Sequence, residues 1–578
     1  MAYGDPRVGA MTGGSDSGPG SDRAKDILRH FEQLEGDRGV WNSHWQEVAD
    51  RVYAKPTGFI TQVTQGAKWT QKIFDATACH ALQRFAAAVE SVICPRAEKW
   101  HTLAPQDPAL AEHPAVKRWC EALTDLLFRV RYGSRSAFAS ESQECFLEMG
   151  AFGTMGMLVD DIANHVGVYP QPVPIVYQAV PLAGFWIEEN SLGQVDTVYR
   201  KFELDGRQAV MQFGAENLNE KVVEDAKQQK PRKWEFIHAV HPTKDRTDYA
   251  WDWRRFPYSS CYVLREAKKL VSEAGYRRHP YAVSRSITTA GEQYGRSPAM
   301  TVLPDIKMLN EISKTMIRAA HKLVDPPLLL ADDGMGSAFD LRPNALNYGH
   351  VDLQGHQLVH PLQTGANLEV GGEMRQDVRT SINDAFLITL FQILVENKEM
   401  TAYEAALRAQ EKGQLLAPTM GRQESEFLAP MIEREIDILW NRGIIQATIG
   451  PPPRELVATG AALKIVFENQ MTQFQRAPEA ARTLMAMQQL TPLASIDPTV
   501  MDIFDPEGVA TVILNANGVP QKARRTPEQL AALKQQRIDQ QAADRALAAA
   551  PVAAQAANDL TQANLQAQSQ PPRLPLAA

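Results

Sequence analysis

Two long amphipathic patterns lie in the middle of the chain, between Thr301 and Lys412. In the first, apolar side chains recur at steps of three and four residues, at Ile306, Leu309, Ile312, Met316, Ala320 and Leu323. In the second, the same kind of stripe is formed by Met374, Val378, Ile382, Leu387, Leu390 and Leu394. Side chains spaced in this way share one face of an α-helix, so the sequence predicts two long helices, 301–324 and 371–394.

Local signals predict where these two helices begin and end. Pro304 suits the first turn of a helix, where its missing N–H costs little, and Asp305 beside it favours the positive end of the helix dipole. The two prolines at 326–327 should end the first helix, because proline cannot continue the hydrogen-bond ladder. The two glycines at 371–372 are expected to break the chain just before the second helix.

A third helix is predicted to start at a capping box. The hydroxyl of Thr401 can accept a hydrogen bond from the backbone N–H of Glu404, whose side chain can reach back to the N–H of Thr401. If the second helix stops near Val395, a tight polar loop remains, formed by Glu396, Asn397, Lys398, Glu399 and Met400. Periodicity alone would make this an ordinary helical hairpin with a large insertion, 326–370, whose short apolar runs indicate a small β-rich subdomain.

The rest of the pattern separates helical segments from a β-rich region. Helical spacing occurs at 22–34, 41–52, 73–93, 114–131, 136–150, 205–213, 402–412, 423–446, 471–490 and 526–549. Short apolar or alternating runs, typical of strands, occur at 157–159, 166–169, 175–180, 184–188, 195–201, 234–240, 261–270, 281–283 and 463–467. Residues 1–21 and the tail after 549 are predicted to be disordered. The sequence therefore predicts an α+β fold that is predominantly helical.

Composition indicates a chain of several domains. With 578 residues, of which 44% are hydrophobic and 22% charged, the chain can bury a large core. No apolar run approaches the roughly 20 residues that a membrane helix needs, and the N-terminus lacks the pattern of a secretory signal. The five cysteines are an odd number without a CxxC pair, which favours reduced structural thiols in a cytosolic setting.

The formal net charge of −8 argues against a protein that grips DNA electrostatically, because such proteins usually carry a basic surplus. The same charge is compatible with a conduit for DNA. Tight contacts that release counterions would hold a polyanion still, whereas a conduit has to let it slide.

Three local patterns resemble chemical sites but have simpler interpretations. Cys79 and His80 lack a further ligand at metal spacing and are interpreted as ordinary packing. The glycines of 150–156 resemble a phosphate-binding loop, but they follow a helix, precede a strand and lack the Lys-Ser/Thr of a P-loop, so a turn with positive φ is expected. Three histidines within 350–360 could suggest a metal cluster, but no helical spacing supports one. We expect neither a metal nor a cofactor.

The search for catalytic residues finds none. Residues 249–255 mix aromatics with arginines, as single-strand binding surfaces do, but rings packed inward from a strand or turn are the preferred interpretation. The adjacent carboxylates at 160–161, 188–189 and 332–333 would point to opposite faces of a strand, which suits joint acid–base work poorly. Without GxSxG, HExxH or Walker A patterns, neither a hydrolase nor an ATP-driven motor is predicted.

Five segments follow one another in order along the chain: DATACHALQRFAAAVESVICPRAEKWHTL, ECFLEMGAFGTMGMLVDD, YGRSPAM, LPDIKMLNEISKTMIRAAHKLVDPPLLLADDG and MTAYEAALR. The ordered set resembles the head-to-tail connector (portal) protein family of short-tailed bacteriophages, over a span that runs roughly from Asp26 to Phe467. No single segment is decisive; the order and spacing carry the resemblance.

The resemblance implies a portal fold with wing, stem, clip and crown. It would assign 1–21 to a disordered leader, 22–300 to a wing that is helical and then β-rich, 301–324 to a stem helix, 325–370 to the clip, 371–394 to the second stem helix, 395–401 to the channel loop, 402–505 to wing helices, and 506–578 to a crown helix and disordered tail.

The resemblance also implies a function and partners. The chain would form a homo-oligomeric, dodecameric ring at one capsid vertex of a virion, assembled in the host cytoplasm, through which double-stranded DNA is packaged and ejected. The expected partners are the packaging terminase, tail adaptor proteins, and the major capsid and scaffold proteins, with no membrane. Stem packing would involve Ile306, Leu309, Ile312, Met316, Val378, Ile382 and Leu390, and the loop Glu396–Met400 would face DNA, followed by the Thr401/Glu404 cap.

Two other classes of protein remain as alternatives. A hydrolase acting on nucleic acid or cell wall could assemble distant carboxylates through the fold. A non-portal scaffold or tail component of a virion could use the same helices for assembly without forming a channel.

Overall fold

A computed structural model describes most of the chain before residue 331 and parts of the remainder. The described residues are 19–53, 58–61, 66, 68–111, 113–162, 174–330, 354, 359–362, 368–388, 420–460, 462–468, 485–486, 488–489, 505, 508–510, 514, 525, 529–543, 558, 560–562 and 565. The chain divides into two compact units. Unit 1 comprises Met1–Thr102, Leu123–Pro451 and Ile465–Pro478, and unit 2 comprises Leu103–Ala122, Pro452–Lys464 and Glu479–Ala578.

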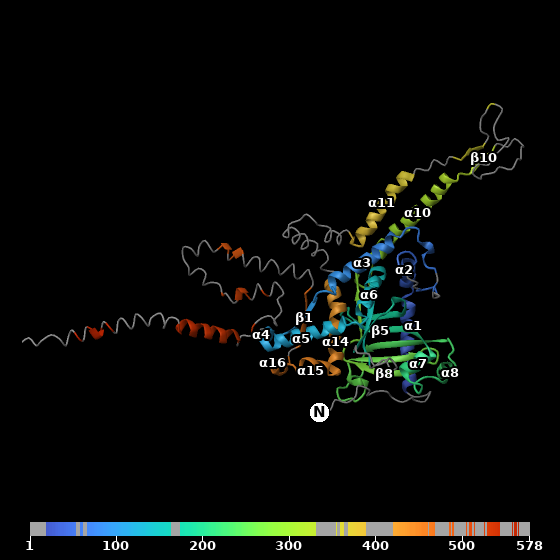
Figure 1. Cartoon of the computed structure of the whole chain (residues 1–578). Helices are drawn as coiled ribbons and strands as arrows, with labels where there is room; N and C mark the ends of the chain where they lie inside the picture. Colours follow the sequence, from blue (N-terminus) through green and yellow to red (C-terminus); the bar gives the residue numbers. More distant parts are fainter. Residues whose placement is uncertain are drawn as a thin grey trace, which may run out of the picture. The chain divides into compact units, whose positions relative to one another are not determined.

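The described part of the chain contains both helices and strands (Figure 1). The helices are α1 (Pro19–Asp37), α2 (Gly39–Ala49), α3 (Thr77–Ile93), α4 (Pro108–Ala111), α5 (Pro114–Arg131), α6 (Phe138–Phe152), α7 (Gly206–Phe213), α8 (Glu220–Lys227), α9 (Pro298–Thr301), α10 (Leu303–Val324), α11 (Leu368–Ala385), the π-helix η5 (Gln423–Leu428), α14 (Ala429–Asn441), α15 (Ile444–Ile449) and α16 (Arg454–Thr459). The strands are β1 (His101–Pro105), β2 (Thr154–Asp161), β3 (Ile175–Ala179), β4 (Phe185–Glu189), β5 (Val195–Asp205), β6 (Lys233–Pro242), β7 (Tyr258–Leu264), β8 (Lys269–Tyr276), β9 (Tyr281–Arg285), β10 (Leu328–Leu330), β11 (Val359–Pro361) and β12 (Leu463–Phe467). The predicted α+β class is confirmed.

The larger sheet of unit 1 is an antiparallel meander in the order β4-β5-β6-β7-β8. A turn at residues 190–193 joins β4 to β5. In this turn the N–H of Gly193, with a φ of 75°, donates to the carbonyl of Asn190 at 3.0 Å. Glycine suits this place because positive φ costs it no steric clash.

Both faces of this sheet are covered, since side chains alternate along each strand. Helix α1 covers one face, where Phe31 meets Trp186 edge to face with ring centroids 4.8 Å apart. Helices α7 and α8 cover the other face, where Phe213 stacks on Phe236 with centroids 5.3 Å apart. The sheet is therefore an interior layer, held by aromatic packing on either side.

A second sheet, in the order β3-β2-β9, receives the chain from α6. Gly153 ends α6 with a φ of 82°, and a Cβ at this position would lie 2.3 Å from the carbonyl oxygen of Gly295. Gly153 thus makes the predicted helix-to-strand turn with positive φ, whereas Gly150 lies in α6 and Gly156 in β2. The close backbone approach leaves room for no other residue there.

Three local expectations need correction. Helix α1 starts at Pro19, so its first turn occupies residues that were assigned to a disordered leader. Residues 216–230, where the sequence pattern predicts no helix, contain α8, whose apolar face includes the buried Val222 against the sheet. The segment 423–446 is divided into η5, α14 and the start of α15, because Gly443 adopts a φ of 68° between the last two.

Unit 2 has few described residues. They include α4, α16, and parts of β1, β12 and α5, followed by helical residues at 529–543. Within unit 2, the N–H of Gln106 donates to the carbonyl of Ala462 at 2.9 Å, next to the strands β1 and β12. The predicted strand at 463–467 is confirmed.

A buried ion pair connects distant parts of unit 1. The guanidinium of Arg131, at the end of α5, donates to both carboxylate oxygens of Glu435 on α14, at 3.0 and 2.5 Å. The hydroxyl of Tyr177 on β3 donates to the same carboxylate at 2.8 Å. Burial disfavours the charge on Arg131, but the Glu435 carboxylate outweighs it and keeps the pKa of Arg131 above its ordinary value. Breaking this pair would leave a buried charge without a partner.

We therefore expect Glu435→Ala to lower the free energy of unfolding by about 3–5 kcal/mol, which denaturant titration would measure. The matched control is Glu266→Ala, which removes the partner of Arg232 from a pair whose side chains are 52% and 48% exposed. That variant should lose no more than about 1 kcal/mol. Equal losses in the two variants would contradict a special role for the buried pair.

Candidate functional site

Helices α10 and α11 run side by side and project from the α3 end of unit 1 (Figure 1). Helix α10 begins as predicted, with Pro304 in its first turn followed by Asp305. It ends at Val324, just before the two prolines at 326–327. The short ladder of β10 and β11 follows, pairing Leu329 with His360, and is the described part of the expected β-rich insertion.

Helix α11 departs from the prediction at its start. It begins at Leu368, so Gly371 and Gly372 lie inside the helix and do not break the chain before it. A Cβ on Gly371 would lie 3.2 Å from the sulfur of Met316 on α10. Gly371 therefore lets the two helices approach closely. In a single sequence, a glycine with this packing role looks the same as a glycine that breaks a helix.

The end of α11 also differs from the prediction. The helix stops at Ala385, and the chain turns at Phe386 and Leu387, where Leu387 has a φ of 58°. The ring of Phe386 is fully buried and meets Phe85 of α3 edge to face, with centroids 6.2 Å apart. Burying this ring favours the turn over a continuous helix to 394, although positive φ is costly for leucine.

A polar cluster fixes the lower part of α10 to the segment before α3. The side-chain carbonyl of Asn310 accepts from the backbone N–H groups of Phe74 and Asp75, at 2.8 and 3.1 Å. Its amide group donates to the carbonyl of Ile306 at 3.0 Å. Asn310 is only 6% exposed, so these hydrogen bonds satisfy a polar group that would otherwise be costly to bury.

The carboxylate of Asp75 extends this cluster to α11. One oxygen accepts from the backbone N–H and hydroxyl of Thr77, and the other accepts from Arg379 on α11 at 2.8 Å and from Ser313 on α10 at 3.3 Å. Burial would raise the pKa of Asp75, but the hydrogen bonds from Thr77 and Arg379 outweigh it and hold that pKa below its ordinary value. A single charged side chain, that of Asp75, thus binds both projecting helices to the segment before α3 in the same unit.

The predicted stem-packing residues divide into two groups. Ile306, Leu309, Val378 and Ile382 are buried within the single chain, where the helices join the rest of unit 1. Ile312 and Met316 are half-buried, and Leu390 lies outside the described residues. Packing of the last three between neighbouring copies stays a prediction.

Large apolar side chains on the outer part of the pair are exposed to solvent. Val324 is 86% exposed, and about half of each side chain is exposed at Met308, Ile317, Leu323, Val370 and Met374. Clusters of this kind on an elongated element are typical of surfaces that another protein covers.

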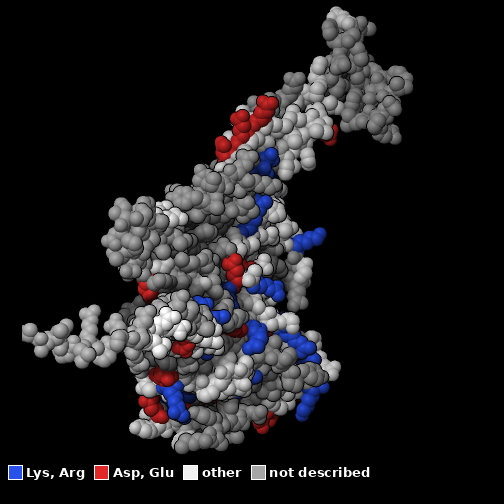
Figure 2. Space-filling view, turned by 60° about the vertical axis from the view of Figure 1, so that its left-hand side comes forward, with Lys and Arg blue, Asp and Glu red and all other residues white. Residues whose placement is uncertain are grey.

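Charged side chains occupy much of the remaining surface of the pair. Figure 2 shows acidic side chains gathered along one edge of it, with basic side chains elsewhere on the same segment. The helix pair therefore combines an anchored base, exposed apolar side chains and segregated charge. It has the character of a surface for assembly.

The predicted channel loop, Glu396–Met400, and its cap, Thr401 and Glu404, lie outside the described residues. The same holds for His350 and His356, and for the carboxylates at 332–333. Their assignments stay predictions.

The structure describes two of the three pairs of adjacent carboxylates, at 160–161 and 188–189, and within each pair the two side chains have different basic partners. On β4, Glu188 lies 3.0 Å from the ring of His30, whereas Glu189 pairs with Arg285. The neighbours Asp160 and Asp161 likewise bind different arginines, on α14 and just after it. Among the described residues, no group of three or more His, Cys, Asp or Glu side chains could hold a metal ion.

The five cysteines are buried, as expected for structural thiols, and none of them forms a disulfide. Burial raises the pKa of the Cys79 thiol to about 11, so this thiol stays protonated and unreactive near neutral pH. Its sulfur lies 3.7 Å from the carbonyl of Arg51, which agrees with ordinary packing.

The aromatic segment 249–255 contradicts the expected inward packing for two of its rings. Tyr249 and Trp251 are 92% and 88% exposed in the loop between β6 and β7. Trp253 instead lies under the guanidinium of Arg23, 3.9 Å from the ring centroid. The loop closes through a hydrogen bond from the N–H of Thr247 to the carbonyl of Arg254, so it has no strand pairing that would turn the outer rings inward.

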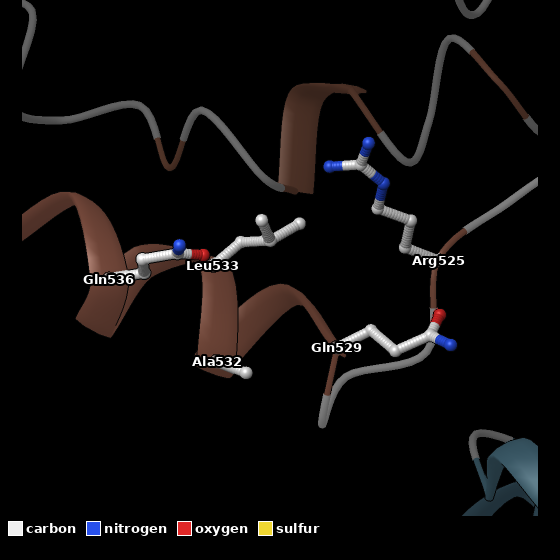
Figure 3. Close-up of a pocket in the computed structure, with 5 residues that line it drawn as sticks. All are labelled: Arg525, Gln529, Ala532, Leu533 and Gln536. Carbon is white, nitrogen blue, oxygen red and sulfur yellow. The ribbon is translucent and has the colours of Figure 1, made fainter.

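A depression in unit 2 offers no catalytic chemistry. Figure 3 shows that one helical segment and the residue Arg525 line it; the lining residues are Arg525, Gln529, Ala532, Leu533 and Gln536. Arg525 is the one charged side chain among these five, so the depression brings together no acid–base pair. In the part of the chain that the structure describes, no helix is both long and apolar enough to span a bilayer.

Comparison with known proteins connects this arrangement to one family. The family described as "Bacteriophage head to tail connecting protein" matches residues 24–524. A protein named "Probable portal protein" from Bordetella phage BPP-1 is 29% identical over 528 residues, which cover 90% of this chain and 92% of that protein. A "Portal protein" from Salmonella phage epsilon15 is 25% identical over 549 residues, covering 93% of this chain and 95% of its own length.

Among solved structures, a chain from the neck of a native gene transfer agent particle, computed with C12 symmetry, is 12% identical. The match covers 75% of this chain and 94% of that chain, with a TM-score of 0.31. Agreement at this level places no individual residue.

We expect the Asp75 cluster to weaken in acid. Because the folded state lowers the pKa of Asp75, its stabilising effect is present above the ordinary carboxyl pKa of about 4 and is lost as the pH falls through the folded value. At pH 7, Asp75→Asn should lower the free energy of unfolding by about 1–3 kcal/mol. The difference from the unsubstituted chain should shrink below pH of about 4, as measured by denaturant titration at several pH values.

The control is Asp26→Asn, since Asp26 forms an ion pair whose side chains are 70% and 69% exposed. It should change stability by less than about 1 kcal/mol at every pH. A pH-independent loss in Asp75→Asn would contradict the proposed role of the carboxylate charge.

Proposed function

The chain belongs to the family of bacteriophage head to tail connecting proteins, and from this we propose that it is the portal protein of a virion, a ring at one capsid vertex. Double-stranded DNA enters the capsid through the ring during packaging and leaves through it on ejection. The family match over residues 24–524 and the two related portal proteins support this role.

The observation that carries the proposal is the exposed apolar surface of an anchored helix pair. Helices α10 and α11 are fixed at their base by Asp75, while apolar side chains such as Ile317, Val324 and Met374 remain in contact with solvent. Further copies of the same chain would cover these side chains in a ring, since a head-to-tail contact that repeats by rotation closes on itself. We propose a dodecamer, with α10 and α11 as the stem.

The loop Glu396–Met400 follows the second stem segment and would face the DNA in the channel. Lys398 would contact phosphates, while Glu396 and Glu399 would prevent a tight grip. The overall net charge of −8 suits this arrangement, because a conduit has to release the polyanion that it guides.

The remaining partners follow from the place of the insert at the end of the stem. Residues 325–370 would form the clip, which meets the packaging terminase during filling and the tail adaptor proteins afterwards. Major capsid and scaffold proteins would contact the wing. The sequence carries no Walker A pattern, so ATP hydrolysis belongs to the terminase and we assign no catalytic step to this chain.

The oligomeric state tests the proposal directly. Purified protein should give a ring with a central hole in negative-stain images, and a native mass that is a whole multiple of 64.1 kDa, with twelve copies as the expected state. A stable monomer at all concentrations would contradict the portal assignment. Hydrolysis of nucleic acid or cell wall that disappears on mutating a carboxylate would support the alternative enzyme.

The channel loop has its own test. Lys398→Ala should leave the ring intact and change the amount of DNA packaged or retained, because the substitution removes the proposed phosphate contact. Lys230→Ala, at a side chain that is 52% exposed on unit 1, is the control and should change neither property. Unchanged virion yield and DNA content in Lys398→Ala would overturn the loop assignment while leaving the ring proposal in place.

A further inference from the structure

Each of the two projecting helices carries a row of like charges. On α10 the row is Lys314, Arg318 and Lys322, and on α11 it is Glu369, Glu373 and Asp377. In both rows the spacing is four residues, which places the side chains on one helical face. We call these rows the basic edge and the acidic edge.

The two edges point away from each other within one chain. The contact of Met316 with Gly371 marks the side on which α10 and α11 touch. A helix turns by about 100° per residue, so a residue two positions away lies on nearly the opposite side. Lys314 and Arg318 stand two positions from Met316, and Glu369 and Glu373 stand two positions from Gly371. The helix pair therefore has a basic edge on one side and an acidic edge on the other.

The two edges also overlap in height along the pair. The contact of Met316 with Gly371, and the hydrogen bond from Ser381 to Asp305 at 3.1 Å, give the same antiparallel register. In that register the level of Lys314 is close to that of Glu373, and the level of Arg318 is close to that of Glu369. The third member of each row lies one helical turn beyond this overlap, outward for Lys322 on the basic edge and toward the base for Asp377 on the acidic edge.

The charges of these edges differ in whether they are paired within the described part of the chain. No ion pair within the described part of the chain includes Arg318, Lys322, Glu373 or Asp377, and Lys314 pairs only with Glu311 on its own helix. By contrast, the charges nearer the base are used internally, since Lys307 pairs with Glu47 and Arg379 pairs with Asp75.

Rows of like charge spaced by four residues destabilise a helix on its own. The acidic side chains in Figure 2 form such a row along the projecting pair. An opposite row on another molecule would remove the repulsion, and this chain itself carries a row of opposite sign, equal spacing and overlapping height.

We propose that the basic edge of one copy contacts the acidic edge of the next copy in the ring. This inference rests on the proposed function, because it assigns the partner of each edge within the stem. The contact is head to tail, so within a closed ring every basic edge meets an acidic edge and no edge is left uncovered. The exposed apolar side chains supply most of the contact area, while the paired charges fix the height at which neighbouring stems meet.

Charge reversal on each edge provides the test. The first variant carries Lys314→Glu, Arg318→Glu and Lys322→Glu, and the second carries Glu369→Lys, Glu373→Lys and Asp377→Lys. Each variant alone would bring like charges together at every contact, so each should lose the ring at a concentration where the unsubstituted chain is fully assembled. An equimolar mixture should restore the ring, because strict alternation of the two variants makes every contact complementary again.

The mixture separates contacts between copies from contacts within one chain. If the edges paired within one chain, only a variant carrying all six substitutions would recover, and the mixture would not. If the basic edge instead bound nucleic acid, the first variant would assemble normally and lose affinity for a short DNA duplex. Either result overturns the inference.

Two further observations keep this test separate from the proposed function. Circular dichroism and thermal unfolding of the two variants show whether each still folds. If one does not, the neutral replacements Lys314→Gln, Arg318→Gln and Lys322→Gln replace it, and the ring should then dissociate at a lower salt concentration than the unsubstituted ring. Rings in all single variants would overturn the charged contact while leaving the portal proposal intact; absence of a ring in the unsubstituted chain would overturn the portal proposal itself.

Discussion

The carboxylate of Asp75 is the interaction on which the projecting helices depend. It accepts hydrogen bonds from Ser313 on α10 and Arg379 on α11, while Asn310 accepts from the backbone N–H groups of Phe74 and Asp75. Apolar packing at the base would tolerate sliding by a turn, because one aliphatic side chain replaces another at little cost. Directed hydrogen bonds to a buried charge do not tolerate it, since a shift would leave the charge without partners. The cluster therefore fixes the height and direction of both helices.

The exposure of apolar side chains follows from that arrangement. Near the base, Ile306 and Ile382 are at most 1% exposed, because α3 and the neighbouring segments cover them. Further out, Ile317, Val324 and Met374 keep about half or more of their surface in solvent. In an isolated chain, the exposed surface of these side chains contributes no stabilisation from apolar burial. Their presence on a rigidly anchored element favours the proposed assembly, in which each stem would cover the next.

The sequence predicted the projecting helices well where the signal was local. Pro304 and Asp305 mark the start of α10, and the prolines at 326–327 follow its end. Proline acts through its own backbone, and the Asp305 carboxylate acts on the helix end beside it, so neither signal depends on tertiary contacts. The errors concern tertiary contacts. Gly371 looks like a helix breaker until its contact with Met316 is known, and the turn at Phe386 depends on a pocket against Phe85 that no spacing reveals. Asn310 and Arg379 were missed for the same reason, because a polar residue on an amphipathic helix gives no sign that it is buried.

Charge placement along the helix pair separates two tasks that a DNA conduit has to perform. A ring must hold its subunits firmly together, and it must hold DNA weakly enough for the duplex to slide. Strong attraction between copies can come from opposite charges on opposite edges of one helix pair, which cancel across each contact. In the proposed ring, carboxylates of the next copy would neutralise Lys314, Arg318 and Lys322, which would then no longer attract phosphates. The cations that strengthen the proposed ring would in this way be kept from the DNA, and an excess of acid over base in the whole chain would be compatible with both tasks.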